Sequence, residues 1–139
     1  MAAFVKAGHP EAETFCCIPP EDRDLWAEAA AVAGLDNLGT DLYWANTGQD
    51  LEGMRPPIRE LAALCRGAGK RHHQWLQCWG VRAGNEPRVA AMGDVLCAEG
   101  PDALYVWAFE GQVGTGEACA DPGRAWAEAC AVLRRAKGP

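Results

Sequence analysis

The sequence predicts an α/β fold in which four consecutive βα units form one parallel sheet. Apolar runs rich in β-favouring residues alternate along the chain with segments of helical periodicity. Turns rich in glycine or proline separate these segments, and no linker or low-complexity tract interrupts the alternation. Strict alternation of strand and helix gives parallel strands joined by right-handed crossovers. Residues 1–139 are therefore expected to form a single domain.

The first two units occupy the N-terminal half of the chain. Residues 13–20 (ETFCCIPP) are a short strand that stops at two prolines. Residues 21–34 form a helix with acids in its first turn, where they suit the helix dipole. Residues 36–44 (DNLGTDLYW) form the second strand, and a polar loop follows it. The next helix has apolar residues at helical spacing: Ile58, Leu61, Leu64 and Cys65.

The last two units repeat this order in the C-terminal half. Residues 72–81 (HHQWLQCWGV) form the third strand, and Asn85 is the expected cap of the helix after it. Residues 103–109 (ALYVWAF) form the fourth strand. Asp121 caps the final helix, with Pro122 at an early helical position.

Side-chain alternation within the strands favours half of a (β/α)8 barrel over a small doubly wound sheet. Four units in 139 residues match the size of half a barrel. Doubly wound strands, covered by helices on both faces, are more uniformly aliphatic. Here one strand face is aliphatic, while the other is aromatic and polar, as expected for a barrel interior that opens into a site. The second face carries Gly39, Asp41 and Tyr43, then Trp75, Gln77 and Trp79, then Tyr105, Trp107 and Phe109.

The composition argues against several classes of partner. Thirteen basic and nineteen acidic side chains give a net charge of −6, which disfavours nucleic-acid binding. No run approaches the roughly 20 apolar residues that cross a bilayer. The start, MAAFVKAGHPEAE, lacks the apolar core of a secretory signal. The seven cysteines are irregularly spaced and lie mostly in apolar segments, so we expect free thiols in a cytoplasmic protein.

Three segments resemble the large clan of retaining (β/α)8 glycoside hydrolases. Residues 35–44 (LDNLGTDLYW) resemble its sixth-strand segment, in which an Asp, a Gly and an aromatic pair recur. Residues 58–80 (IRELAALCRGAGKRHHQWLQCWG) resemble the next unit, whose seventh strand carries the catalytic nucleophile. Residues 101–112 (PDALYVWAFEGQ) resemble the eighth strand, which places a tryptophan at the floor of the sugar site. The resemblance implies the C-terminal half of a barrel that binds a carbohydrate or polyol at its C-terminal strand ends.

The chain departs from this clan at the catalytic positions. Alignment on Gly69 and Lys70 puts Leu76 or Gln77 where the clan has its nucleophilic glutamate. The strand that carries the clan's general acid falls outside the matching half. Retaining hydrolysis needs two carboxyl groups about 5 Å apart, so the resemblance supports binding better than catalysis.

The candidate site residues lie at the C-terminal ends of the strands, where we expect their side chains to face the same rim of the barrel. Asp41 could orient a hydroxyl or act as a base, or it could be a structural carboxylate. Glu110 is the other carboxylate near the rim, or it could be a solvated loop acid. Aromatic rings stack on sugars, or they simply fill a barrel interior. The Gln77 amide either binds a ligand or joins an internal network. The catalytic candidates are Asp41 and Glu110, and the substrate-binding candidates are Tyr43, Trp44, Gln77, Trp79 and Trp107.

No cofactor or metal is expected. His72, His73 and Cys78 lack a metal-binding spacing, and adjacent histidines point to opposite faces of a strand, so we interpret the histidines as helix-end polar residues. The glycine-rich residues 110–118 (EGQVGTGEA) lack the order of a phosphate-binding loop. A doubly wound domain that binds a phosphorylated ligand there remains an alternative.

The predicted sheet has two unpaired edges and an aromatic face open to water. Such a face is too apolar to remain uncovered. We therefore expect a homo-oligomer, or a barrel whose N-terminal half lies elsewhere. The alternative to a carbohydrate-binding protein is a non-catalytic barrel remnant that acts only through association.

Overall fold

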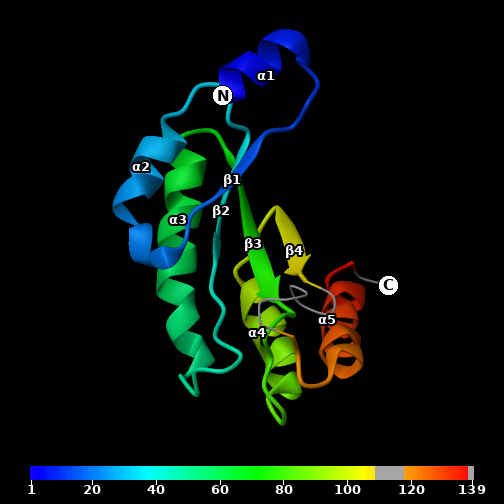
Figure 1. The fold of residues 1–139 in the computed structure, drawn as a ribbon. Coiled ribbons are helices and arrows are strands. Elements are labelled where there is room, and N and C mark those ends of the chain that lie inside the picture. Colours follow the sequence, from blue (N-terminus) through cyan, green and yellow to red (C-terminus); the bar gives the residue numbers. More distant parts are fainter. Residues whose placement is uncertain (109–117, 138–139) are drawn as a thin grey trace.

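The computed structural model describes residues 1–108 and 118–137 and contains a four-stranded, all-parallel sheet flanked by helices (Figure 1). Neighbouring strands follow one another in chain order, β1-β2-β3-β4. The predicted α/β fold of consecutive βα units is therefore confirmed. The strands are β1 (Phe15–Cys17), β2 (Asn37–Asp41), β3 (Arg71–Gln77) and β4 (Ala103–Trp107).

The helices follow the predicted order, with shorter elements than the sequence indicated in the first unit. The α-helices are α1 (Ala2–Gly8), α2 (Asp24–Ala30), α3 (Arg55–Gly67), α4 (Glu86–Ala98) and α5 (Pro122–Ala136), and the 3₁₀ helices are η1 (Pro20–Asp22) and η2 (Leu51–Met54). The sequence did not indicate α1. The predicted cap at Asp121 is confirmed, because its carboxylate accepts from the Arg124 amide at 2.9 Å. Asn85 does not cap α4 with its side chain, which donates to Asn46 Oδ1 instead.

Helices α2 to α5 lie on one face of the sheet (Figure 1). Right-handed crossovers that all advance in the same direction put their helices on the same side. The even-numbered strand residues face these helices, and Leu38, Leu42 and Leu76 are fully buried among them. A doubly wound sheet would have helices on both faces, which the described residues do not show. Trp26 is 2% exposed and packs in the core, as its helical position predicted.

The odd-numbered strand residues share the opposite face. The register aligns Cys17 with Gly39 and His73, and Asp41 with Trp75. His72 and His73 both lie inside β3 and are buried, so their interpretation as helix-end residues was wrong. The reason is that β3 begins at Arg71, directly after the turn that ends α3.

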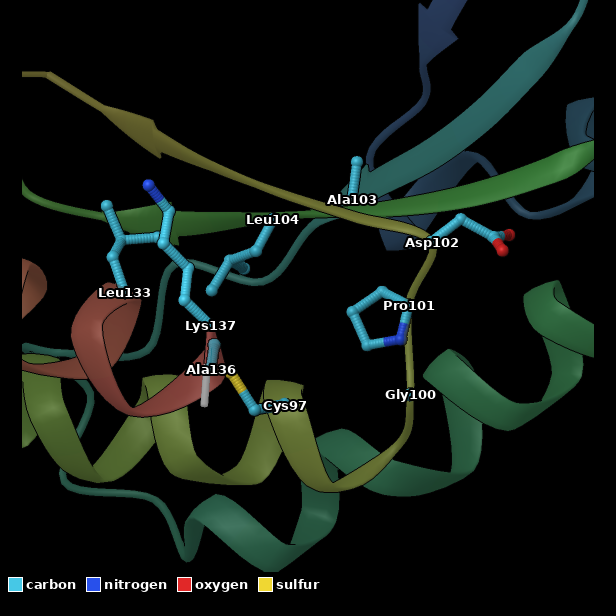
Figure 2. Close-up of a pocket in the computed structure, with 9 residues that line it drawn as sticks. All are labelled: Cys97, Gly100, Pro101, Asp102, Ala103, Leu104, Leu133, Ala136 and Lys137. Carbon is cyan, nitrogen blue, oxygen red and sulfur yellow. The ribbon is translucent and has the colours of Figure 1, made fainter. Parts of the chain in front are cut away.

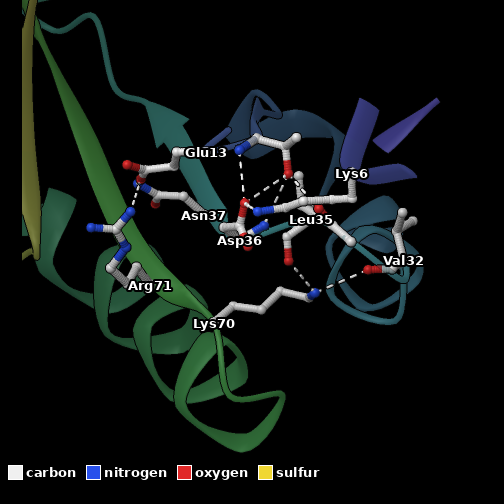
Figure 3. A network of polar contacts seen from close by, with 10 residues as sticks. Lys6, Glu13, Val32, Leu35, Asp36, Asn37, Lys70 and Arg71 are labelled. Atoms are coloured by element: carbon white, nitrogen blue, oxygen red, sulfur yellow. Dashed lines mark hydrogen bonds and ion pairs between the residues drawn. The ribbon is translucent and has the colours of Figure 1, made fainter. Parts of the chain in front are cut away.

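Polar side chains link the N-terminal ends of the strands (Figure 3). One ion pair joins Lys6 to Asp36 at 2.7 Å. A second joins Arg71 to Glu13, and Glu13 also accepts from Asn37 Nδ2 at 3.2 Å. The Lys70 ammonium donates to the carbonyl oxygens of Leu35 at 2.7 Å and Val32 at 3.0 Å, which ties β3 to the turn after α2.

All seven cysteines are free. Across residues 1–108 and 118–137, no helix combines the length and the apolar character that a membrane crossing requires.

Candidate functional site

Five side chains meet where β1, β2 and β3 end, and we call them the strand-end cluster. Asp41 is the last residue of β2, and Tyr43 follows two residues later. Gln77 is the last residue of β3, with Trp79 two residues beyond it. Because side chains two residues apart in extended chain point the same way, each strand contributes a pair. The cluster consists of Cys17, Asp41, Tyr43, Gln77 and Trp79.

Asp41 is held in a half-buried position on the sheet. Its Oδ1 is enclosed and has no hydrogen-bond partner within the described chain. Burial raises the pKa of the Asp41 carboxyl, and the nearby Glu21 carboxylate raises it further, whereas hydrogen bonding by Tyr43 and Cys17 acts in the opposite direction. A carboxylate that is ionised here lacks the full solvation it would have in water. Asp41 therefore keeps unused acceptor capacity at this edge of the sheet.

Tyr43 and Trp79 form an aromatic corner beside this carboxylate. Their ring centroids lie 5.4 Å apart with the planes at 87°, an edge-to-face contact. Burial raises the pKa of the Tyr43 hydroxyl, and the charge of Asp41 adds to the effect. The hydroxyl therefore stays protonated and acts as a donor at neutral pH.

The Gln77 amide is engaged with the backbone at both of its ends. Oε1 accepts from the Ala45 amide at 3.0 Å, and Nε2 donates to the Trp79 carbonyl oxygen at 3.0 Å. The side chain is 3% exposed. Gln77 thus links the loop after β2 to the loop after β3, which favours the internal-network alternative for this residue.

A second group of aromatic side chains, which we call the aromatic face, continues from the cluster across the sheet. Trp75 and Tyr105 have ring centroids 5.0 Å apart, and Trp107 meets Trp75 edge-on at 6.0 Å. Phe15 and His73 also contact this group, with their ring centroids 5.8 Å apart. Trp75 is the register partner of Asp41, so the two groups adjoin. The aromatic face consists of Phe15, His73, Trp75, Tyr105 and Trp107.

The sequence-predicted residues are brought together only in part. Asp41, Tyr43, Gln77 and Trp79 gather in the strand-end cluster, and Trp107 lies on the adjoining aromatic face, 42% exposed. Trp44 is separate: it packs against the core on the helix side, and a Cβ at Gly53 would lie 3.2 Å from its ring. Glu110 lies outside the described residues.

Sequence reasoning missed two residues of this surface. Cys17 adjoins Asp41, and burial followed by the charge of Asp41 raises the pKa of its thiol, which therefore stays protonated. His73 donates from Nδ1 to Asn37 Oδ1 at 2.8 Å, because Asn37 uses its amide nitrogen to donate to Glu13. The residue parity that selected Asp41 also selects Cys17 and His73.

His73 is neutral and unavailable as an exposed base. Burial, and to a smaller extent the neighbouring His72, lower its pKa to about 4. Its Nε2 is enclosed, without a hydrogen-bond partner in the described part of the chain. The imidazole lies directly over Gly39, where a Cβ would clash with the ring and lie 2.5 Å from the His73 carbonyl oxygen.

A cavity of about 420 Å³ opens beside the cluster, at the loops that follow β2 and β3. Trp79 lines one side of it, and Asn46 and Arg82 add polar groups. Asn46 Oδ1 already accepts from the Arg82 amide at 2.9 Å, and its Nδ2 donates to the Gly80 carbonyl oxygen at 2.6 Å. These bonds fix the cavity wall, and the Arg82 side chain supplies the charge at its rim.

The arrangement offers hydrogen-bonding groups and aromatic rings at one edge of the sheet. Within residues 1–108 and 118–137, no three His, Cys, Asp or Glu side chains gather as metal ligands. Comparisons with protein-family models, curated proteins and solved structures found no match to this chain. A functional assignment therefore rests on the chemistry of the strand-end cluster.

Proposed function

We propose that the chain binds a carbohydrate or a related polyol at the C-terminal ends of its strands. Asp41 accepts a hydrogen bond from a ligand hydroxyl, and the oxygen of Tyr43, whose O–H donates to Asp41, accepts another. Trp79 and Trp107 provide flat apolar rings on which the C–H face of a sugar packs. The observation that carries the proposal is the half-buried Asp41 carboxylate with an enclosed, unpartnered Oδ1 beside these rings.

The chemistry of this surface suits a polyol better than other small molecules. A sugar offers hydroxyl donors to carboxylates and apolar faces to aromatic rings at the same time. A phosphate would meet the acidic Asp41 and Glu21, which repel an anion. Ligand sites in parallel α/β folds lie at the C-terminal strand ends, where this cluster is found.

Binding is better supported than hydrolysis. Retaining hydrolysis requires two carboxyl groups about 5 Å apart across one bond. In the described chain, Asp41 is the carboxylate that the strands supply to the cluster, and Gln77 has both ends of its amide bonded to the backbone. We therefore assign Asp41 a binding role.

Calorimetric titration with a panel of mono- and oligosaccharides, read together with tryptophan fluorescence, tests the proposal. We expect at least one sugar to bind the wild-type chain and to shift its fluorescence. Asp41→Asn and Trp79→Ala should each weaken that binding about tenfold or more, which is about 1.4 kcal/mol. Phe4→Ala is the matched control, because Phe4 is an exposed aromatic residue on α1, away from the C-terminal strand ends.

Thermal melts of each variant separate lost binding from lost folding. A panel-wide absence of binding by the folded wild type would refute the proposal. So would binding that a folded Asp41→Asn and a folded Trp79→Ala both leave unchanged.

A non-catalytic barrel remnant is the second candidate. The Gln77 amide favours it, because both of its ends are bonded to the backbone. The alignment with the glycoside hydrolase clan puts Leu76 or Gln77 at the position of the nucleophile. A chain that folds and associates yet binds no sugar would be this remnant.

A further inference from the structure

The exposed large apolar side chains concentrate on the two outer units of the sheet. Beyond residues 1–8, the described residues of this kind are Phe15 at 55%, Leu25 at 46%, Val32 at 44% and Trp107 at 42% exposed. Phe15 lies on β1, Leu25 on α2 and Val32 just after α2, and Trp107 lies on β4. The two inner strands and the helices α3 and α4 contribute none of them. Scattered exposure is normal, but exposure confined to both edges indicates that both edges are interfaces.

In the part of the chain that the structure describes, no strand pairs with the outer side of β1. The Ile18 amide donates to the Gly39 carbonyl oxygen at 3.0 Å, so Cys16 and Ile18 direct their amides to β2. Because amides alternate in direction along a strand, those of Phe15 and Cys17 point away from β2. A three-residue parallel edge strand with free amides is a template for another parallel strand.

The other edge carries a cavity of about 510 Å³ between β4, α4 and α5 (Figure 2). Its walls are apolar and are formed by Leu104 of β4, Leu133 and Ala136 of α5, and Cys97 of α4. It lies on the helix side of β4, which is an edge strand of the described sheet. The helix layer beside this edge is therefore incompletely filled.

The helices beside the two edges carry opposite charge. Helix α2 has two acids, Asp24 and Glu28, and no Lys or Arg, which gives −2. Helix α5 has three arginines and one acid, Glu128, which gives 3 − 1 = +2. Placed side by side, α2 and α5 attract each other despite the net charge of −6 on the chain.

We propose that a second copy of this chain completes the sheet, with β4 of each copy pairing in parallel with β1 of the other. A twofold axis parallel to the strands brings both edges together at once and closes eight strands into a barrel. Helix α5 of one copy then packs against α2 of its partner, which covers Leu25 and Val32. The aromatic face becomes the interior and buries Phe15, while Trp107, the last residue of β4, lies at the C-terminal mouth.

A second copy fits better than an unrelated partner because the two edges of this chain complement each other. The edges match in strand direction, in apolar exposure and in helix charge. In a closed twofold dimer each copy offers the same two surfaces, so both interfaces form together. The inference stands apart from the proposed carbohydrate binding.

Sedimentation equilibrium over a range of concentrations tests the dimer. The wild-type chain should give about twice its 14.9 kDa mass. Leu25→Arg puts a cation against the basic α5 of the partner and should raise the dimer dissociation constant about tenfold or more, which is about 1.4 kcal/mol. Phe4→Arg is the matched control, because it makes the same change at an exposed residue of α1, and should leave the constant within about twofold of wild type.

Hydrogen exchange of the wild-type chain gives a test that needs no variant. The Phe15 and Cys17 amides should exchange more slowly as the protein concentration rises and the dimer forms. A cooperative monomer at every concentration would overturn the proposal, as would a dimer in which these two amides exchange at the monomer rate. Equal weakening by Leu25→Arg and Phe4→Arg would also overturn it. A dimer that binds no sugar supports this proposal while refuting carbohydrate binding, and a sugar-binding monomer does the reverse.

Discussion

Asp36 and Asp41 lie at the two ends of β2, and their surroundings shift the pKa values of the two carboxyl groups in opposite directions. Lys6, at 2.7 Å, and the Thr14 amide, at 2.8 Å, lower the pKa of Asp36 to about 2. Burial raises the pKa of Asp41, and no partner within the described chain reaches its Oδ1. The charge of Asp36 is thus neutralised at the N-terminal end of β2, whereas the charged form of Asp41 is disfavoured at the C-terminal end.

This difference separates stability from function along one strand. In parallel α/β barrels the N-terminal ends serve stability, and the C-terminal ends carry the sites. At the N-terminal end, hydrogen bonds and an ion pair connect His73, Asn37, Glu13 and Arg71 in one chain of contacts. At the other end, Asp41 is half-buried, and its Oδ1 has no hydrogen-bond partner in the described chain. We infer that the first end holds the sheet together and that the second is kept for a ligand.

The largest expected effect comes from Gly39→Ala, which attacks the N-terminal network from the middle of β2. The added Cβ would collide with the His73 imidazole and lie 2.5 Å from the His73 carbonyl oxygen. The ring would have to leave its bond to Asn37. We expect a loss of about 3 kcal/mol in the free energy of unfolding, measured by urea denaturation.

Gly67→Ala is the control for this change. Gly67 is the last residue of α3, and a Cβ there would have nothing within 4 Å. Alanine favours a helix over glycine by about 1 kcal/mol at most, so stability should hold or rise slightly. If Gly39→Ala were as mild as Gly67→Ala, the network would not be the rigid end of the sheet.

The sequence predicted the architecture well because the fold depends on periodic signals. Alternation of strand and helix gave the parallel sheet, and residue parity identified the two strand faces. Strand ends were less accurate, since the chain leaves the ladder where loop contacts begin: Gln77 ends β3 although the apolar run continues to Val81. Helix α1 escaped prediction because seven residues with no buried side chain produce no apolar stripe.

The candidate site was predicted in part, for a similar reason. Parity placed Asp41, Gln77 and Trp107 on one face, but it could not show which polar groups the backbone would satisfy. Trp44 lies apart from these residues, because its ring turns to the helix side and packs near Gly53. Such choices depend on loop geometry, which a single sequence does not encode in a periodic form.

The next effect concerns the C-terminal end, through Gln77→Glu. The carboxylate can still accept from the Ala45 amide, but it cannot donate to the Trp79 carbonyl oxygen and would face it instead. We expect the free energy of unfolding to fall by about 2 kcal/mol at neutral pH, less than for Gly39→Ala. Because burial raises the pKa of a carboxyl group, the loss should shrink as the pH falls and the new glutamate becomes protonated.

Gln49→Glu makes the same change on an exposed side chain and should leave stability nearly unchanged. Glycosidase assays on Gln77→Glu add a second readout. Hydrolysis should appear only if another carboxyl group supplies the general acid. A variant as stable as Gln49→Glu would show that the Gln77 amide is free for a ligand, contrary to the network seen here.

The smallest and most direct test compares Asp36→Asn with Asp41→Asn, which should change stability in opposite directions. At neutral pH, Asp36→Asn removes an ion pair with Lys6 and lowers the melting temperature. Asp41→Asn removes a carboxylate that is only partly solvated and raises the melting temperature, while it weakens ligand binding. Urea or thermal melts of both variants and of wild type measure the two signs.

The pH dependence of these melts follows from the same two pKa shifts. The folded pKa of Asp36 is lowered to about 2, so its stabilisation is full above the unfolded value of about 3.9 and is lost as the pH falls toward 2. The folded pKa of Asp41 is raised, so its contribution is most favourable at low pH and is lost as the pH rises through that value. Asp36→Asn should therefore flatten the loss of stability at acidic pH. Asp41→Asn should flatten the loss of stability that occurs as the pH rises. Two variants that flatten the same limb would show that both ends of β2 hold their carboxylates alike, and the division between a stabilising end and a binding end would fail.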